Sequence, residues 1–336
     1  MLQTNNIEYD TIVLSGASTK GILILGSLQL LQDQHLINNV SNFIGTSSGS
    51  MICYLLCIGY TPIEILVFMC TNNLLSKMQT FNMVDLIQGN GATSFHPIHE
   101  AIEKMTIDKI GYLPTIKNIK ENFGKNLIIV THNISEDKTE YISVDNYPDI
   151  PCLVAIRMSA NIPLIFDHYK YGSSFYIDGG ISDNFPIQIG DKIGKRIIGL
   201  NLDSGHSDKQ KITDLETLEY FYKLILIPVS QAVSYKIEQA SNNCDIINIT
   251  SNKDLKIFDF NLNSKIIMDM FSSGYNIAEE FIKEKQVSKD ETQDETSKDE
   301  TQDETQDETS KDETSKDETS KDETHNETST YNDKLV

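Results

Sequence analysis

Residues 42–49 read NFIGTSSG, an apolar run that passes into a G-x-S-x-G turn centred on Ser47. Residues 50–58 (SMICYLLCI) follow with the composition of a buried helix. A serine hydroxyl is a weak nucleophile at its free pKa, and a strained strand-to-helix turn can expose it beside a base. Gly45 and Gly49 allow close backbone approach, and the first helical amides favour a developing negative charge. The stretch predicts a nucleophile turn, although the pattern alone also fits a plain helix cap.

A second strand, loop and helix precede this turn. Residues 9–14 (YDTIVL) form a β-rich run, and residues 20–36 show helical periodicity. The intervening loop, SGASTKG at 15–21, gathers backbone amides at a helix N-terminus. It is not a phosphate-binding loop of the Walker type, because Ile22 follows Gly21, and Ser18 occupies the central glycine of the dinucleotide pattern. Two successive units predict an α/β fold with a mostly parallel sheet and helices on both faces.

The third motif is YIDGG at residues 176–180. It places Asp178 at the end of an expected strand, before Gly179 and Gly180. In a doubly wound sheet the carboxyl ends of neighbouring strands meet at one crevice, so Asp178 is expected to approach Ser47 and accept its proton. Taken alone, Asp-Gly-Gly is also a common turn.

The remaining pattern completes the α/β interpretation. The apolar window at 51–70 is interrupted by Gly59, Pro62 and Glu64, which favours two buried helices over a membrane span. Further strands are expected at 126–132, 139–144, 175–178, 196–202 and 245–249, and helices at 149–160, 214–240 and 264–284. We expect an N-terminal extension at 1–9, a catalytic domain at 10–200, and an α/β extension at 201–284 packed on the same core.

The C-terminal segment has a different composition. Residues 288–328 repeat SKDET and QDET and hold 8 Asp, 9 Glu and 5 Lys, a net charge of −12 out of −21 for the chain, which leaves −9 for the rest. This segment has no Ile, Leu, Val, Phe or Tyr, so a disordered acidic tail is expected at 285–336. A body of net negative charge without a basic stripe makes nucleic acid an unlikely partner.

No metal or cofactor is expected from the sequence. His96 and His99 supply two potential ligands without a third nearby, and the five cysteines include no Cys-x-x-Cys pair. The residues at 1–10 (MLQTNNIEYD) lack the basic and apolar regions of a secretory signal. A cytoplasmic protein with reduced thiols is therefore expected.

Together the three motifs resemble the patatin-like phospholipase family. Segments 114–115, 127–130 and 157–163 also look like parts of that family, so the resemblance covers about residues 10–200. It implies a three-layer fold and a lipid acyl hydrolase that forms an acyl-enzyme and contacts a membrane or micelle peripherally. It also implies these roles: Ser47 and Asp178 as the catalytic dyad, Gly16, Ala17 and Ser18 as the oxyanion hole, and Lys20, Gly21, Gly45, Gly49, Gly179 and Gly180 as motif or anion-contact residues.

One departure from the family pattern affects the oxyanion loop. The family has a run of glycines where this chain has Gly16-Ala17-Ser18. If the donor geometry requires a positive φ, Ala17 and Ser18 cost about 1 kcal/mol or more each. A catalytically impaired lipid-binding or scaffold protein is therefore one alternative. The other is a Ser-His-Asp α/β-hydrolase, for which His206 is the histidine of the globular part that follows Asp178.

Overall fold

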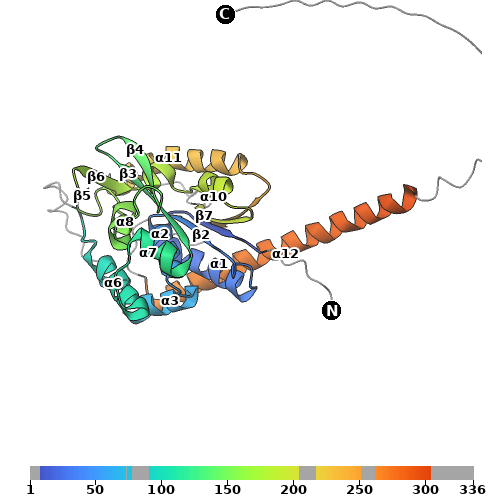
Figure 1. Cartoon of the computed structure of the whole chain (residues 1–336), viewed down its shortest axis with the longest axis horizontal. Helices are drawn as coiled ribbons and strands as arrows, with labels where there is room; N and C mark the ends of the chain where they lie inside the picture. Colours follow the sequence, from blue (N-terminus) through green and yellow to red (C-terminus); the bar gives the residue numbers. More distant parts are fainter. Residues whose placement is uncertain (1–7, 73, 78–90, 204–216, 251–261, 304–336) are drawn as a thin grey trace, which may run out of the picture. The chain divides into compact units, whose positions relative to one another are not determined.

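A computed structural model describes residues 8–72, 74–77, 91–203, 217–250 and 262–303. Residues 1–285 form one compact unit and residues 286–336 form another. Figure 1 shows the first unit as a central sheet with helices on either side. The motif residues all belong to this first unit.

Eight strands form one mixed sheet in the described part of the chain, in the order β5-β6-β3-β2-β1-β7-β8, with β4 pairing to β3 outside this path. The strands are β1 (Thr11–Leu14), β2 (Asn42–Thr46), β3 (Asn126–Asn133), β4 (Lys138–Ile142), β5 (Tyr169–Tyr171), β6 (Ser174–Asp178), β7 (Ile197–Asp203) and β8 (Cys244–Thr250). Strands β3, β2, β1, β7 and β8 are parallel to one another, while β4, β5 and β6 add antiparallel pairs. The expected α/β fold with a mostly parallel sheet is confirmed.

The central strands bury side chains on both faces, as parallel sheets do when helices cover each side. Val13 and Ile44 belong to one cluster, which includes Val233 of α11 (Thr217–Glu238). Ile12 and Phe43 belong to the larger cluster on the other face. Successive side chains along each strand therefore pack alternately into the two clusters, one on each face of the sheet.

The helices form a layer on each face of the sheet (Figure 1). On one face lie α10 (Ile187–Ile193) and α11 (Thr217–Glu238). The other face carries α1 (Gly21–Asp33), α2 (Ser48–Cys57), α3 (Pro62–Thr71), α6 (His96–Ile110), α7 (Ile116–Phe123) and α8 (Cys152–Ser159). The short elements are η1 (Ser18–Lys20), α4 (Leu74–Lys77) and α9 (Gly180–Asp183).

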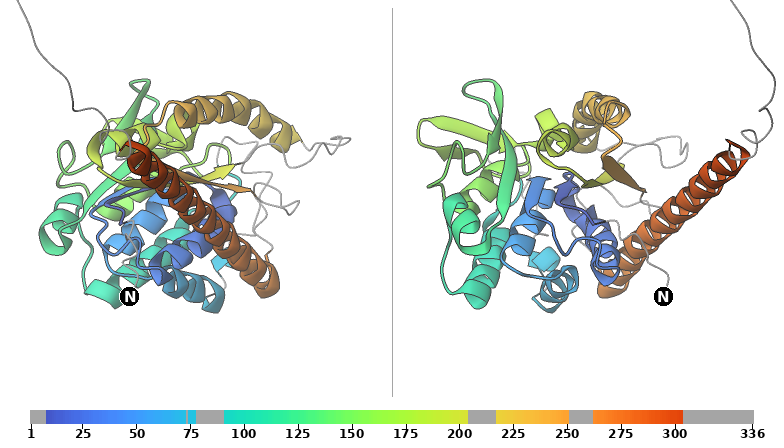
Figure 2. Two further views of the ribbon diagram at one scale, coloured as in Figure 1. Left: turned by 90° about the vertical axis from the view of Figure 1, so that its right-hand side faces the viewer. Right: turned by 45° about the vertical axis from the view of Figure 1, so that its right-hand side comes forward.

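The first part of α12 (Ser264–Asp303) packs against α1, as both views of Figure 2 show. Ser27 of α1 donates a hydrogen bond of 2.7 Å to the Gly274 carbonyl. Met270 and Phe271 join the larger core cluster. The segment at 264–285 thus belongs to the same core as the motif residues.

Several boundaries differ from the expectations. Tyr9, assigned to an N-terminal extension, is fully buried and donates a hydrogen bond to Asp245 of β8. Pro151 precedes the first residue of α8, so that helix begins at Cys152 rather than at 149. Helix α12 continues through residues 286–303, where we expected a disordered tail. Residues 304–336 lie outside the described residues.

The window at 51–70 forms two helices, as predicted. Among the described residues no single helix is long and apolar enough to span a membrane, and α2 and α3, which together have the length and composition, are bent by 116°. All five cysteines are free thiols; Cys53, Cys57 and Cys152 are buried, and Cys70 and Cys244 are half-buried.

Candidate active site

Ser47 is the one residue between the end of β2 and the start of α2. Its φ of 53° and ψ of −123° place it in a region that costs a non-glycine residue about 1–3 kcal/mol. A Cβ at Gly45 would overlap the backbone of Gly49, and a Cβ at Gly49 would overlap the carbonyls of the β1 end. The flanking glycines therefore let β2, α2 and β1 approach closely enough to hold this strained turn.

Asp178 lies in direct contact with Ser47. The Ser47 Oγ donates a hydrogen bond of 2.6 Å to Asp178 Oδ2, and the Gly180 amide donates one of 2.7 Å to Asp178 Oδ1. Both side chains are buried, at 6% exposure each. Burial raises the pKa of Asp178 to about 6, against the lowering effect of these two hydrogen bonds. The carboxylate is thus a stronger base than an exposed aspartate and is still ionised at neutral pH.

The register of β3 explains why these two side chains meet. Residues 126–130 of β3 pair with β2, residues 131–133 pair with β6, and β4 pairs with 129–133. The β3 residues that pair with β4 also pair with β2 or β6, so β4 lies along the opposite edge of β3. Strands β2 and β6 therefore follow one another along the same edge of β3. Thr46 lies opposite Val130 and Asp178 opposite Thr131. We expected parallel neighbouring strands to bring the pair together, but β6 is antiparallel to β3 and meets β2 end to end.

The segment after α8 holds both members of the pair, and its role was not recognised from the sequence. The Ser159 hydroxyl accepts the Ser47 amide at 2.9 Å, and the Ser159 carbonyl accepts the Gly179 amide at 3.1 Å. The Asn161 carbonyl accepts the Asp178 amide at 2.9 Å. Segment 157–163 was noticed for its resemblance to the family, and that was the available signal.

The Arg157 side chain fixes the conformation of this segment. It donates 2.5 Å and 3.0 Å hydrogen bonds to Asn161 Oδ1 and the Asp167 carbonyl, and its guanidinium lies 4.5 Å and 4.9 Å from the ring centres of Phe95 and Tyr169. Burial lowers its pKa to about 10, so it stays protonated. The guanidinium is thus held by two aromatic rings, an amide oxygen and a backbone carbonyl, and it fixes the backbone that follows α8.

The loop at 15–21 lies beside Ser47, and the amides of Gly16 and Ala17, which we expected to be oxyanion donors, already have acceptors. The Gly16 amide donates to the Asn184 carbonyl at 3.0 Å, and the Ala17 amide donates to Ser48 Oγ at 3.0 Å. Ala17 has a φ of −145°, whereas Ser18 has a φ of 49°. Ala17 and Ser18 stand where the family has glycines, and of these two only Ser18 has a positive φ. Backbone strain is therefore expected at Ser18 only.

Lys20 occupies the N-cap position of α1 and Gly21 begins that helix. Burial lowers the pKa of Lys20, and no carboxylate among the described residues forms an ion pair with it. Gly21 has an ordinary helical φ of −53°, and a Cβ there would make normal contacts. Gly21 is thus not required sterically.

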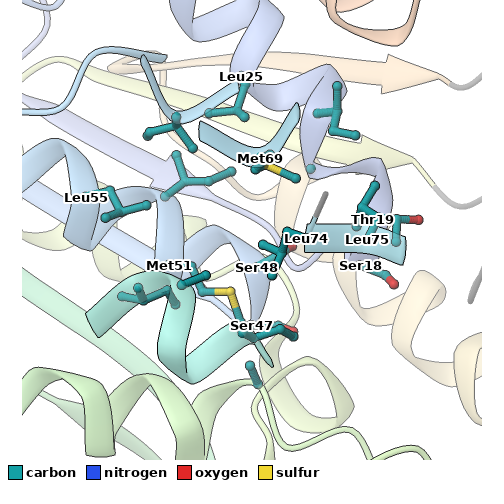
Figure 3. A pocket seen from close by; sticks show the side chains of 18 of the residues that line it. Ser18, Thr19, Leu25, Ser47, Ser48, Met51, Leu55, Met69, Leu74 and Leu75 are labelled. Atoms are coloured by element: carbon teal, nitrogen blue, oxygen red, sulfur yellow. The ribbon is translucent and has the colours of Figure 1, made fainter. Parts of the chain in front are cut away.

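A cavity of about 140 Å³ opens from Ser47 between α1, α2, α3 and α6. Figure 3 shows Ser47 and Ser48 at one end and the apolar side chains of Met51, Leu55 and Met69 lining it. Leu74 and Leu75 of α4 also face this space. The Ser47 turn therefore borders an apolar compartment.

The other candidate groups lie elsewhere. His96 is exposed and His99 is half-buried on α6, where they lie 3.2 Å and 3.9 Å from Glu100 and Glu103, and no group of three potential metal ligands occurs among the described residues. The direct bond between Ser47 and Asp178 leaves no position for an imidazole between them, as a Ser-His-Asp hydrolase requires. His206 lies outside the described residues.

A sequence model of the patatin-like phospholipase family matches residues 12–191, more than half of the 336 residues. The chain belongs to this family. The matched range contains the loop at 15–21, Ser47 and Asp178, so the three motifs lie within the patatin-like region.

Two relatives illustrate the likeness. A probable lipid hydrolase, 463L, of Invertebrate iridescent virus 6 is 41% identical over 188 residues, which cover 54% of this chain and 63% of that protein. The uncharacterized protein R571 of Acanthamoeba polyphaga mimivirus is 28% identical over 285 residues, or 82% of this chain and 95% of that protein. Among solved structures, VipD from Legionella pneumophila aligns with a TM-score of 0.46 and 14% identity over 82% of this chain and 67% of that one.

Proposed function

We propose that this protein is a serine-dependent lipid acyl hydrolase with a Ser47-Asp178 dyad. The observation that carries the proposal is the 2.6 Å hydrogen bond from Ser47 Oγ to Asp178 Oδ2 at the end of an apolar cavity. Membership of the patatin-like family supports the same reaction class. No residue of the dyad requires a metal or cofactor for the chemistry.

The reaction proceeds in two halves. Ser47 Oγ attacks the ester carbonyl carbon while its proton passes to Asp178 Oδ2, and a tetrahedral oxyanion forms. Asp178 then returns this proton to the departing alkoxide as the carbon–oxygen bond breaks, which leaves an acyl-serine. A water gives its proton to Asp178 and attacks the acyl carbon, and the proton returns to Ser47 as the fatty acid leaves. A base whose pKa is about 6 suits both directions of transfer near neutral pH.

The oxyanion is stabilised by backbone amides at two helix starts. The first amides of α2 have no carbonyl four residues earlier within the helix, and no acceptor for the Ser48 amide is found among the described residues. The Ala17 amide is the second donor and exchanges its present acceptor, Ser48 Oγ, for the oxyanion when that hydroxyl rotates. Gly16 and Ser18 hold the loop in place for this exchange.

The cavity accepts the acyl chain. Its volume of about 140 Å³ is close to that of an engineered apolar cavity of about 150 Å³ that binds benzene. It therefore holds roughly six carbons without rearrangement. Met51, Met69 and Met105 line it, and unbranched thioether side chains repack readily to lengthen it. We expect esters whose acyl chains fit this volume to have lower KM values than esters of longer chains, because longer chains require the cavity to repack.

A labelling experiment tests the site directly. A fluorophosphonate should modify Ser47, located by peptide mapping, and Ser47→Ala should abolish both labelling and hydrolysis of short-chain esters, lysophospholipid and phospholipid. Labelling at another serine, or unchanged turnover in Ser47→Ala, contradicts the proposal. Turnover in the presence of a chelator should be unaffected.

The second candidate is a lipid-binding protein with little turnover. The engaged amides of Gly16 and Ala17 favour it, because a lost oxyanion donor lowers turnover by about two to three orders of magnitude. In that case Ser47 would still react with the fluorophosphonate, but no ester of the series would be hydrolysed. Labelling together with hydrolysis supports the enzyme.

A further inference from the structure

Asp183 is a buried carboxylate on α9 that takes no part in the dyad. Its side chain is 5% exposed and is held from two sides. The Tyr141 hydroxyl of β4 donates a hydrogen bond of 2.8 Å to Asp183 Oδ2, and Lys236 Nζ of α11 lies 2.6 Å from Asp183 Oδ1. Burial and the Asp183 carboxylate raise the pKa of Tyr141, so its hydroxyl stays protonated and remains a donor. Three elements, α9, β4 and α11, are thus joined at one carboxylate.

The backbone of Asp183 contacts the chain neighbours of both members of the dyad. Its carbonyl accepts a hydrogen bond of 2.9 Å from the hydroxyl of Thr46, which directly precedes Ser47. Its amide donates a hydrogen bond of 2.8 Å to the carbonyl of Gly179, which directly follows Asp178. A residue whose side chain is fixed by β4 and α11 therefore connects the β2 end to the β6 end.

The same backbone continues into a contact with the loop at 15–21. The Asn184 carbonyl accepts the Gly16 amide at 3.0 Å, and the Asn184 side-chain amide donates to the Gly16 carbonyl at 3.3 Å. Since Asn184 directly follows Asp183, a displacement of Asp183 moves this contact as well. The side-chain contacts of Asp183 thus fix the backbone that touches this loop as well as the two strand ends.

The ion pair between Asp183 and Lys236 is better suited to fixing a geometry than to stabilising the fold. The two side chains are 5% and 19% exposed, so both charges lose most of their hydration. This loss offsets much of the attraction, and apolar replacements of buried ion pairs are often neutral or stabilising. What the pair provides is a directional contact that only one arrangement of α9 and α11 satisfies.

A cluster of similar composition lies at the other end of the sheet. The Tyr9 hydroxyl donates a hydrogen bond of 2.7 Å to Asp245 Oδ2, and an Arg196 nitrogen lies 3.1 Å from the same oxygen. Lys285 also pairs with Asp245, which is 5% exposed. These groups lie at the beginnings of β1, β7 and β8, whereas Ser47 follows the end of β2, and the four strands are parallel. The Asp245 cluster is therefore buried and charged in the same way, at the sheet edge opposite Ser47.

We propose that Asp183 is a positioning residue that aligns Ser47 with Asp178. Lys236 and Tyr141 fix its side chain, and its backbone transmits the alignment to the residues before Ser47 and after Asp178. The proposal rests on the proposed function, since this alignment matters for a reaction at Ser47. A misplacement of reacting groups by about 1 Å can lower turnover by about 100-fold. Loss of the cluster should therefore lower kcat even where the fold is retained.

The test replaces the whole cluster by apolar side chains in the full chain. In Tyr141→Phe/Asp183→Leu/Lys236→Met one negative and one positive charge are removed together, so no charge is left buried alone. We expect kcat on a water-soluble short-chain ester to fall by about 10- to 100-fold with KM unchanged. The Tm in differential scanning calorimetry should stay equal or rise. A triple variant with parental kcat overturns the proposal.

The pH profile gives a readout that a purely structural role would not move. The hydrogen bond from Ser47 lowers the pKa of Asp178, so a lengthened bond raises that pKa above about 6. The acid limb of kcat/KM should therefore move to higher pH in the triple variant. A smaller amount of folded enzyme would reduce kcat/KM at every pH without moving this limb. A lower kcat with an unmoved acid limb therefore overturns the positioning role.

Two control variants and one milder variant complete the comparison. Tyr9→Phe/Arg196→Met/Asp245→Leu removes the cluster at the other end of the sheet and should leave kcat and the acid limb at parental values; an equal loss there contradicts the proposal. Lys236→Arg keeps the ion pair and should retain most of the parental kcat. If the triple variant does not fold, Asp183→Asn/Lys236→Met, which keeps an acceptor for the tyrosine hydroxyl, should show the same changes at smaller size. Parental kinetics in this double variant overturn the proposal.

Labelling by a fluorophosphonate keeps this proposal apart from the proposed function. The rate of labelling at Ser47 also depends on proton transfer to Asp178, so it should fall in the triple variant even if the parent hydrolyses no ester. A parent that is labelled without hydrolysis, beside a triple variant that is labelled more slowly, contradicts the proposed function and leaves the positioning role standing. Hydrolysis by the parent with equal labelling rates in both proteins overturns the positioning role alone.

Discussion

The two strand-to-helix turns near Ser47 differ in where the strained residue lies and in which group fixes the backbone. The β2–α2 turn concentrates its strain in Ser47, at a φ of 53°, and the Ser159 hydroxyl fixes its amide. The β1–α1 turn is longer, places the positive φ at Ser18, and is fixed through the Asn184 carbonyl. Ser159 and Asn184 lie on either side of Asp178 in the chain. One segment, 159–184, therefore contacts the Ser47 turn and the loop at 15–21 and also carries Asp178.

The largest expected effect removes the base from the Ser47 turn. Asp178→Asn should lower kcat by about 10²- to 10⁴-fold, because the amide cannot accept the serine proton. The fold should persist, as the amide can still bond to Ser47 or to the Gly180 amide. Steady-state hydrolysis of a short-chain ester beside a circular dichroism spectrum checks both parts. Parental turnover in this variant would show that the hydrogen-bonded pair is not a dyad.

The second test disturbs the loop at 15–21 where it faces the Ser47 turn. In Gly16→Ala the new Cβ would overlap Asn184 Oδ1 and lie 3.3 Å from Ser47 Cβ, so we expect a kcat loss of about 10²- to 10³-fold. Gly21→Ala is the matched control, because its Cβ would come no closer than 3.6 Å to any neighbour. Equal kinetics for the two variants would contradict a role for the Gly16 position.

Ser159 tests the shared anchor. Ser159→Ala leaves the buried Ser47 amide without its acceptor, which costs about 1–3 kcal/mol, or roughly 10- to 100-fold if the cost falls on the transition state. The loss should appear in kcat with KM unchanged, and Ser159→Thr should recover most of it. Ser182→Ala, which removes a 3.3 Å bond to Gly179 on α9, serves as the control. A fall in Tm without a fall in kcat would reduce Ser159 to a structural residue.

The pH dependence of kcat/KM and of stability should report on the ionisation of Asp178. Since the pKa of Asp178 is about 6, kcat/KM should fall about tenfold for each unit below pH 6. Burial raises this pKa above the value of 3.8 for an exposed aspartate, so the folded state binds the proton more tightly. The contribution of Asp178 to stability therefore falls as pH rises from about 4 to 6, by about 2–3 kcal/mol.

Asp178→Asn removes this cost, so the variant should melt above the parent at pH 7, and the difference should vanish near pH 4. Differential scanning calorimetry at both pH values measures it. A constant difference at both pH values would mean that the charge of Asp178 does not cause it.

The smallest effect concerns backbone strain in the donor loop. Ser18→Gly relieves a positive φ and should leave stability equal or slightly higher, whereas Ala17→Gly only loosens the unfolded chain and should cost about 0.4–1 kcal/mol. Urea denaturation of the two variants gives the comparison. The reverse order of stability would mean that the strain lies at Ala17 rather than at Ser18.

The sequence by itself determined the α/β class and the elements that carry the motifs. The short apolar runs of β1 and β2, the two glycine-bounded turns and the interrupted window at 51–70 are local patterns, and the structure has strands and helices at those positions. Local spacing also singled out Ser47 and Asp178, because a nucleophile turn and a strand-end carboxylate each have a short signature.

Tertiary structure alone decided how these parts meet. The antiparallel β6 continues the edge of β3 where β2 ends, and the partners Ser159 and Asn184 are 112 and 168 residues from Ser47 and Gly16. Pairing and hydrogen bonding over such separations depend on the register of whole strands, which no local pattern encodes.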